Sequence, residues 1–164
     1  MKKILRALVS VALLAGLTMV APQVATAQET IGPFPACPNF DVSLTISGGN
    51  QALRQTRVKD GVIYTVTAGS GTTIIFNAVG KKGTILKSVT FDTKGSVTKT
   101  ATSGNLTTFQ ITGFGTLLLF PTDPGGPSTT VYNGKVTFTL DQTGTLVSTV
   151  VNSGRTFDIC AALS

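Results

Sequence analysis

The chain contains no histidine, and this restricts its chemistry more than any residue that it does contain. Without an imidazole it cannot form a Ser-His-Asp or Cys-His site, or a metal site with imidazole ligands. Its two cysteines, Cys37 and Cys160, are expected to be oxidised to a disulfide, which leaves no thiolate nucleophile or ligand. The sequence therefore predicts no cofactor, no metal site and no catalytic residue, and it favours a protein that is not an enzyme.

Carboxylates are the remaining side chains that could catalyse a reaction, since a glycoside hydrolase needs only a pair of them. Asp41 and Asp158 are the best candidates, because each lies at a polar position of a strand expected near one end of the chain. Four other aspartates lie in turn-like sequences, where Asp commonly hydrogen-bonds its own backbone: Asp60, Asp92, Asp123 and Asp141. We interpret Asp41 and Asp158 first as solvated side chains, and keep a carboxylate-dependent glycan hydrolase as a less favoured alternative.

Aromatic residues near the middle of the chain are candidates for binding an apolar ligand. Phe114, Phe120 and Tyr132 lie around the longest apolar run that follows the N-terminal leader, and they could line a hollow in a barrel. Nine Phe and no Trp in a chain of this size are also needed to fill a core. A carrier of a small apolar ligand is therefore a second alternative function.

Lysines indicate a further kind of partner. Lys81, Lys82, Lys87, Lys94 and Lys99 lie in neighbouring hairpins and could gather on one face that attracts an anionic polymer of the cell wall. Such lysines more commonly solvate turns and protect edge strands. Of 13 Lys and Arg, 10 follow the leader, against 7 acids, which gives a net charge of +3 and predicts no nucleic-acid partner.

The first 27 residues have the pattern of a secretory signal peptide. A basic start precedes the apolar run from Ala7 to Val20 and the small-residue cleavage signal Ala25-Thr26-Ala27. The run has 14 residues, fewer than the ~20 that a membrane-spanning helix needs. We expect cleavage after Ala27, a secreted, extracellular protein, and no membrane span once the leader is removed.

Residues 40–164 are expected to form a single all-β domain, preceded by a Pro-rich entry segment, 28–39, without regular structure. Segments of alternating polar and apolar residues recur between turn residues, and Asp60-Gly61 has the composition of a tight hairpin turn. The segments expected as strands are 40–46, 52–59, 62–68, 72–79, 84–91, 96–102, 106–112, 117–120, 135–140, 145–151 and 155–160. The pattern predicts an antiparallel meander of about ten strands, forming a barrel or a barrel-like sandwich.

A Cys37–Cys160 disulfide is predicted to join the two ends of this domain, because an exported protein meets an oxidising environment. Closing a loop of more than 120 residues would remove on the order of 5 kcal/mol of unfolded-state entropy. The bond requires the two Cα atoms to lie within roughly 7 Å. We therefore expect the first and last strands to end side by side, which would help to close the sheet.

The apolar run Leu117 to Phe120 is the feature around which the expected strands are arranged. Its odd and even positions are both apolar, so both faces of the strand carry apolar side chains. The run is therefore expected to be buried on both faces or to have its outer face covered by the loop that follows. That loop, Pro121 to Pro127, is too rich in Pro and Gly to continue a helix or a central strand.

The letters LLLFPTDPGGPSTTVYNGKVTFTLD, GTLVSTVV and the closing RTFDICAALS resemble small exported proteins of actinobacteria whose function is uncharacterised. The resemblance covers most of the chain from Cys37 to Ser164 in layout, with specific letters chiefly after Leu117. It implies a secreted β domain and assigns no catalytic residue. The favoured function is therefore a secreted, non-enzymatic binding or structural module, a conclusion reached by excluding catalytic groups.

Overall fold

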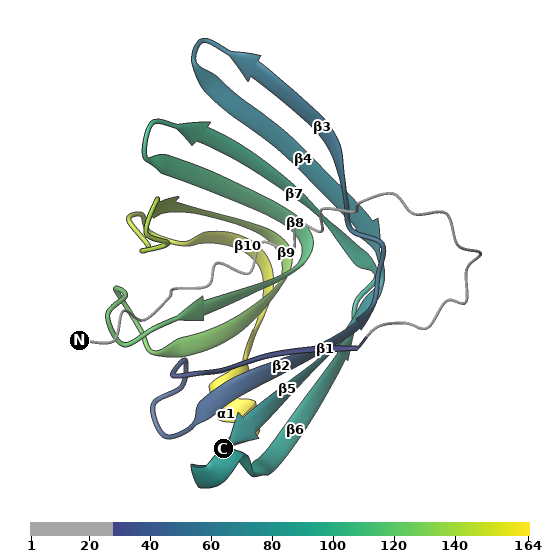
Figure 1. The fold of residues 1–164 in the computed structure, drawn as a ribbon, viewed down its shortest axis with the longest axis vertical. Helices are drawn as coiled ribbons and strands as arrows, with labels where there is room; N and C mark the ends of the chain where they lie inside the picture. The colour runs from purple at the N-terminus through teal and green to yellow at the C-terminus, as the bar shows by residue number, and fades with distance from the viewer. Residues whose placement is uncertain (1–27) are drawn as a thin grey trace.

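Ten strands form two antiparallel sheets in the computed structural model, which describes residues 28–164 (Figure 1). The four-stranded sheet has the order β1 (Glu29–Phe34), β2 (Asp41–Gly48), β5 (Thr72–Val79) and β6 (Ile85–Asp92). The six-stranded sheet has the order β10 (Val151–Asp158), β9 (Ser128–Asp141), β8 (Leu106–Leu119), β7 (Gly95–Ser103), β4 (Val62–Ser70) and β3 (Ala52–Lys59). The prediction of an all-β, sandwich-like fold of about ten strands is confirmed, and the sheets do not close into a barrel.

The chain passes between the two sheets three times, at β2 to β3, β4 to β5 and β6 to β7. Each connection is short, and the first two contain a glycine, Gly49 and Gly71. An added Cβ at Gly71 would collide with the carbonyl oxygen of Thr93. The hairpin between β3 and β4 turns at Asp60 and Gly61, whose φ angles of 52° and 75° match the tight turn predicted there.

Glycines form a row across the middle of the six-stranded sheet. Gly154 pairs with Gly134, Gly134 pairs with Gly113, and Gly113 pairs with Ser96, which in turn pairs with Gly69. The φ angles of Gly113 and Gly134 are +99° and +150°, outside the range that other residues readily adopt. The long strands β8 and β9, which contain Gly113 and Gly134, are bent along their length in Figure 1.

The bend changes which face of the sheet is buried. In β9, Thr129 and Val131 are buried before Gly134, whereas Val136 and Phe138 are buried after it. Side chains alternate between faces along a strand, so these two pairs lie on opposite faces of the sheet. On the sandwich side of the glycine row, the six-stranded sheet packs one face against the four-stranded sheet, and Leu117 of β8 is buried on the other face. Beyond the row, only the face that points away from the sandwich contains buried residues.

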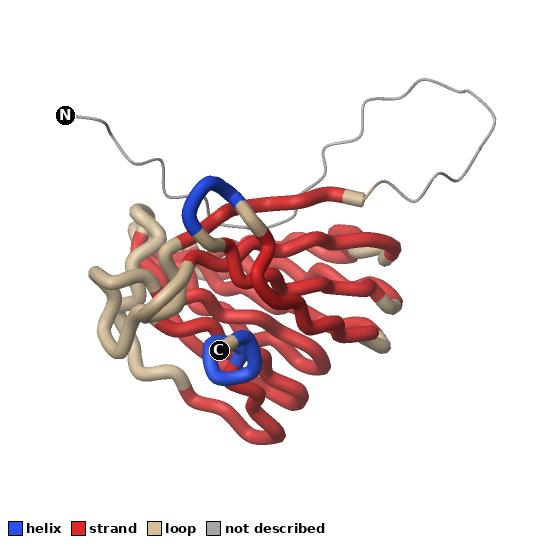
Figure 2. The backbone as a smooth tube through the Cα atoms, turned by 90° about the horizontal axis from the view of Figure 1, so that it is seen from below, coloured by secondary structure: helices blue, strands red, loops and turns tan. Residues whose placement is uncertain are grey.

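Two apolar clusters follow from this arrangement. The sandwich core lies between the sheets and contains Cys37, Val42, Leu44, Phe76, Ala78, Val131, Ile159 and Leu163. The outer core lies on the opposite face of the six-stranded sheet and contains Leu117, Val136, Phe138, Leu140 and Leu146. Helix α1 (Ile159–Leu163) contributes two residues to the sandwich core, contacting β9 of one sheet and β5 and β6 of the other (Figure 2).

The apolar run near the end of β8 packs on both faces, as its sequence predicts. Leu118 packs against the sandwich core, whereas Leu117 and Leu119 belong to the outer core. The following loop is held by Asp123, whose carboxylate accepts a hydrogen bond of 2.8 Å from the backbone N–H of Phe120. The loop therefore ends the strand and stays close to its apolar residues.

Three local expectations are wrong. Strand β1 forms within the Pro-rich segment expected to lack regular structure, because it is an edge strand paired only with β2, so a proline such as Pro33 needs no second partner. Residues 145–151 form no strand before Val151, because Leu146 and Val150 instead cover the outer core. The last residues form the five-residue helix α1, which the strand pattern did not predict.

The disulfide between Cys37 and Cys160 is confirmed, with a Cα–Cα distance of 5.5 Å. It does not close a sheet, however. Cys37 follows β1 of the four-stranded sheet, and Cys160 lies in α1 directly after β10 of the six-stranded sheet. The ends of the terminal strands therefore meet at the disulfide, as expected. The expectation that the bond helps to close one sheet is wrong, because it ties the two sheets together beside the sandwich core.

Replacing both cysteines by alanine is expected to lower the free energy of unfolding by about 2–5 kcal/mol, because the bond closes a separation of 123 residues. Urea unfolding of the oxidised protein, followed by circular dichroism, measures this loss. Chemically reduced wild-type protein is the control and should unfold at the same midpoint as the variant. A midpoint equal to that of the oxidised protein would contradict the prediction.

The glycine row makes a second prediction about stability. Gly113→Ala is expected to lower the free energy of unfolding by about 2–4 kcal/mol, because the new Cβ would lie 2.6 Å from the carbonyl oxygen of Gly95 at a φ of +99°. Gly104→Ala is the matched control, since its φ is +54° but no atom lies within 4 Å of the added Cβ. It should lose only about 1–2 kcal/mol, and an equal loss in both variants would show that the close approach is unimportant.

Candidate functional site

Strands β3, β4 and β7 lie in the part of the six-stranded sheet that extends beyond the sandwich (Figure 1). No residue of β3, β4 or β7 is buried, and β3 is exposed over almost its whole length. Neither apolar cluster contains a buried residue from these three strands. A sheet that carries so little of the core is positioned to present its faces to a partner.

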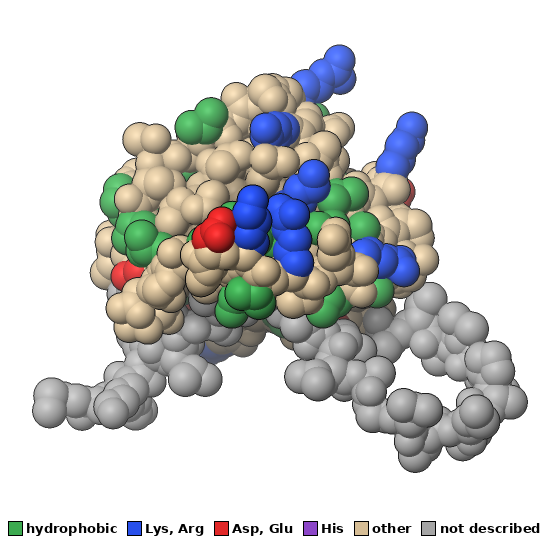
Figure 3. All heavy atoms as spheres, turned by 90° about the horizontal axis from the view of Figure 1, so that it is seen from above, with side chains coloured by type: hydrophobic (Ala, Val, Ile, Leu, Met, Phe, Trp, Pro, Cys, Tyr) green, Lys and Arg blue, Asp and Glu red, His purple; other side chains and the backbone are tan. Residues whose placement is uncertain are grey.

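One face of this sheet is basic. Residues opposite each other in paired strands share a face, and so do residues two apart along one strand. Arg57 pairs with Tyr64, Lys99 pairs with Gln110, and Lys135 pairs with Thr112. This alternation places Arg57, Lys99 and Lys135 on the same exposed face, together with Lys59. We call this surface the basic face. Figure 3, which views the molecule from above, shows several Lys and Arg side chains close together with an acidic side chain beside them.

The cations of the basic face are spread out rather than focused on one point. Arg57, Lys99 and Lys135 lie on β3, β7 and β9, and each is two strands away from the next. Each cation also lies two residues along the strand direction from the position directly across the sheet from its neighbour. With ~4.8 Å between strands and ~3.4 Å per residue, neighbouring cations stand roughly 12 Å apart along a diagonal. This spacing suits an extended chain of anionic groups better than a single small anion.

At the centre of the basic face, the side chains between the cations are neutral. Gln110 and Thr137 lie opposite each other in β8 and β9 and offer hydrogen-bonding side chains beside Lys99. The guanidinium of Arg57 lies 4.7 Å from the centre of the Tyr64 ring, a cation–π contact that holds it over the sheet. Two carboxylates lie at the margins of the face, Asp60 in the hairpin turn and Asp141 at the end of β9.

The structure brings together only part of the lysine group considered from the sequence. Lys99 lies on the basic face, but Lys81 and Lys82 lie in the 3-10 turn η1 (Lys81–Gly83) of the four-stranded sheet. The Lys87 side chain donates a hydrogen bond of 2.7 Å to the backbone carbonyl of Ser164. Arg57 and Lys135 were missed, because their neighbourhood depends on strand register, for which the sequence carries no local signal.

Asp41 and Asp158 are not brought together. Asp41 is the first residue of β2 and precedes the buried Val42. Neighbouring side chains of a strand point to opposite faces, so Asp41 faces outward from the four-stranded sheet. The carboxylate of Asp158 accepts a hydrogen bond of 3.0 Å from the backbone N–H of Ala161 and caps helix α1. Asp158 pairs with Thr130, on the face of the six-stranded sheet that points away from the sandwich core. The two carboxylates lie on opposite outer surfaces.

The aromatic candidates pack into the fold. Phe114 packs against the sandwich core, with its ring centre 5.8 Å from that of Phe91. Phe120 meets Phe34 edge to face at 6.1 Å. Tyr132 packs against the outer core, and its burial raises the pKa of the phenol above 10.0, while a hydrogen bond with Thr130 acts in the opposite direction.

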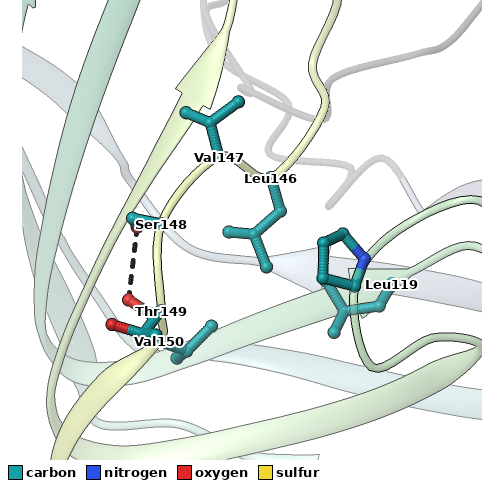
Figure 4. Close-up of a pocket in the computed structure, with 7 residues that line it drawn as sticks. Leu119, Leu146, Val147, Ser148, Thr149 and Val150 are labelled. Carbon is teal, nitrogen blue, oxygen red and sulfur yellow. Dashed lines mark hydrogen bonds between the residues drawn. The ribbon is translucent and has the colours of Figure 1, made fainter.

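A surface hollow of about 420 Å³ lies beside the outer core (Figure 4). Its lining residues are Leu119, Pro124, Leu146, Val147, Ser148, Thr149 and Val150. The Ser148 hydroxyl within it donates to the carbonyl of Thr149 at 3.2 Å and accepts from the backbone N–H of Thr139 at 2.8 Å. The hollow is open and none of Phe114, Phe120 and Tyr132 lines it, so it provides little of the enclosure that a small apolar ligand requires.

Comparisons with protein-family models, curated proteins and solved structures return no match. The resemblance to exported actinobacterial proteins therefore stays a prediction. Among residues 28–164, no helix is long and apolar enough to cross a membrane, and no three His, Cys, Asp or Glu side chains are grouped to hold a metal ion.

Tyr132→Phe is expected to make the protein less sensitive to alkaline pH. The folded state raises the pKa of this phenol above 10.0, so the stability that this shift contributes is complete below pH 10.0 and is lost as the pH rises through the folded pKa. Melting temperatures measured from pH 9 to pH 11 should fall more steeply for wild type than for the variant. Parallel curves would contradict the prediction.

Proposed function

We propose that this chain is a secreted, non-enzymatic binding domain that holds an extended anionic polymer of the cell exterior on its basic face. The observation that carries the proposal is the exposed diagonal of Arg57, Lys99 and Lys135 on a sheet whose strands β3, β4 and β7 contribute little to the core. A phosphodiester polymer of the cell wall has the charge and the extended form that such a surface would recognise.

Secretion is supported from two sides. The signal-peptide pattern lies in residues 1–27, outside the described residues. The Cys37–Cys160 disulfide joins residues 123 positions apart and is compatible with an oxidising compartment outside the cytosol. In that setting an anionic wall polymer is an available partner, whereas a nucleic acid is not an expected one.

The geometry favours several weak contacts over one strong contact. Exposed ion pairs contribute only about 0–1 kcal/mol each, so one lysine on this surface would bind a single phosphate poorly. A polymer that meets three or four cations at once gains from effective concentration, because the first contact brings the next anion close to its partner. Binding of this kind is expected to be salt-dependent, since the cations are exposed.

A charge-reversal experiment tests the proposal. Wild-type protein should be retained on beads carrying poly(glycerol phosphate) and released by added salt, and it should not be retained on beads carrying a neutral glucan. Lys99→Glu combined with Lys135→Glu is expected to weaken the binding constant by about tenfold or more, since each reversal replaces an attraction with a repulsion.

Lys81→Glu combined with Lys82→Glu is the matched control. Both lysines are exposed and lie outside the basic face, and the pair changes the net charge by the same amount. This variant should be retained nearly as well as wild type. Equal losses of retention in the two double variants would show that net charge, rather than the basic face, determines binding. If wild-type protein is not retained on the polyanion, the proposed function is overturned.

A further inference from the structure

Strand β3 leaves one side of its backbone without a neighbour among residues 28–164. It is the last strand of the six-stranded sheet and pairs only with β4. Its residues are exposed from Leu53 to Lys59, and two apolar side chains on it, Leu53 and Val58, are 63% and 70% exposed. A long exposed edge of this kind can accept another strand through its free N–H and C=O groups.

The hairpin turn identifies which backbone groups are free. The two-residue turn at Asp60 and Gly61 is closed by Lys59 and Val62, which form the hydrogen-bonded pair next to the turn. Antiparallel pairs alternate between hydrogen-bonded and non-hydrogen-bonded, so Val58 and Thr56 occupy non-hydrogen-bonded positions. Their N–H and C=O groups therefore point away from β4, toward the open edge.

The two faces of this edge differ in chemistry. Arg57 and Lys59 project on the basic face, while Thr56 and Val58 project on the opposite face. Val58 is paired with Ile63, which is 45% exposed, so an apolar strip extends from the edge onto β4. A strand added to this edge would meet cations on one face and apolar side chains on the other.

We infer that the β3 edge binds an extended polypeptide segment of a partner protein, in which acidic and apolar side chains alternate. Main-chain hydrogen bonds to Thr56 and Val58 would hold the segment, and the alternation would set its register. Acidic side chains would then lie beside Arg57 and Lys59, and apolar ones beside Val58. This inference does not depend on the proposed polymer binding, because it rests on the open backbone edge of β3 and shares only Arg57 and Lys59 with the basic face.

A second copy of this chain fits the edge less well. Pairing β3 with β3 of another copy would bring Arg57 and Lys59 of both chains onto adjacent strands, and like charges on neighbouring strands are destabilising. The same cations that would disfavour self-pairing favour an acidic partner. Charge complementarity therefore selects an acidic polypeptide over another copy.

A synthetic eight-residue peptide with glutamate and valine alternating is the probe for this edge. Titration of labelled peptide into wild-type protein, followed by fluorescence anisotropy, should show saturable binding. A peptide of the same composition with the two residue types in blocks should bind at least about tenfold more weakly, because its side chains cannot match both faces at once.

Thr56→Pro tests the backbone contact. Proline removes the outward N–H without removing a hydrogen bond to β4, since proline is tolerated where the N–H of an edge strand faces solvent. Binding of the alternating peptide should fall by about tenfold, the equivalent of one lost hydrogen bond. Retention on poly(glycerol phosphate) should not change, which separates this inference from the proposed function and shows that the variant is folded.

Arg57→Glu combined with Lys59→Glu keeps the inference falsifiable if the proline variant does not fold. This variant should no longer bind the alternating glutamate–valine peptide and should instead bind an alternating lysine–valine peptide. A folding defect cannot produce such a reversal of peptide preference. The inference is overturned if wild type fails to bind the alternating glutamate–valine peptide, if it binds the blocked peptide equally well, or if it sediments as a dimer that pairs through β3. Unchanged peptide binding by a folded Thr56→Pro variant would also overturn it.

Discussion

The bend at the glycine row is the constraint on which the rest of the structure depends. An added Cβ at Gly134 would collide with the carbonyl oxygen of Ser153, and one at Gly154 would collide with that of Asn133, so the strands can approach this closely only with glycine. Because the strands bend here, β8 and β9 contribute one face to the sandwich core and the other to the outer core. A single pair of long strands thereby stabilises two cores.

Beyond the glycine row, the six-stranded sheet is packed only where β8 and β9 carry the outer core. On one side of the row, the disulfide and α1 hold the two sheets together around buried residues such as Phe76 and Ile159. On the other side, β3, β4 and β7 continue as a single layer with no buried residue. Such a layer is stabilised mainly by its backbone hydrogen bonds and by cross-strand pairs such as the Thr65–Thr100 hydroxyl contact of 2.6 Å.

Local sequence patterns were sufficient for most of the strands, the Asp60-Gly61 hairpin and the disulfide, because each depends on neighbouring residue types or on the only available partner. These local patterns could not predict the register between strands that are far apart in the sequence. Lys99 and Lys135 share a face only because β7, β8 and β9 pair in one particular register. Strand β1 was missed because prolines exclude a central strand but not an edge, and the position of a strand in its sheet is not encoded locally.

The charges that oppose self-association of the single layer are the same ones that suit it to the proposed binding. An exposed edge with apolar side chains such as Val58 would associate with other copies unless charge prevented it. Arg57 and Lys59 supply that charge and, with Lys99 and Lys135, make the layer basic on one face. The proposed polymer binding and the inferred strand addition would then use different parts of one surface, the centre of its basic face and its open edge. A polymer could therefore occupy the face while a peptide occupies the edge, with competition confined to Arg57 and Lys59, where the two sites meet.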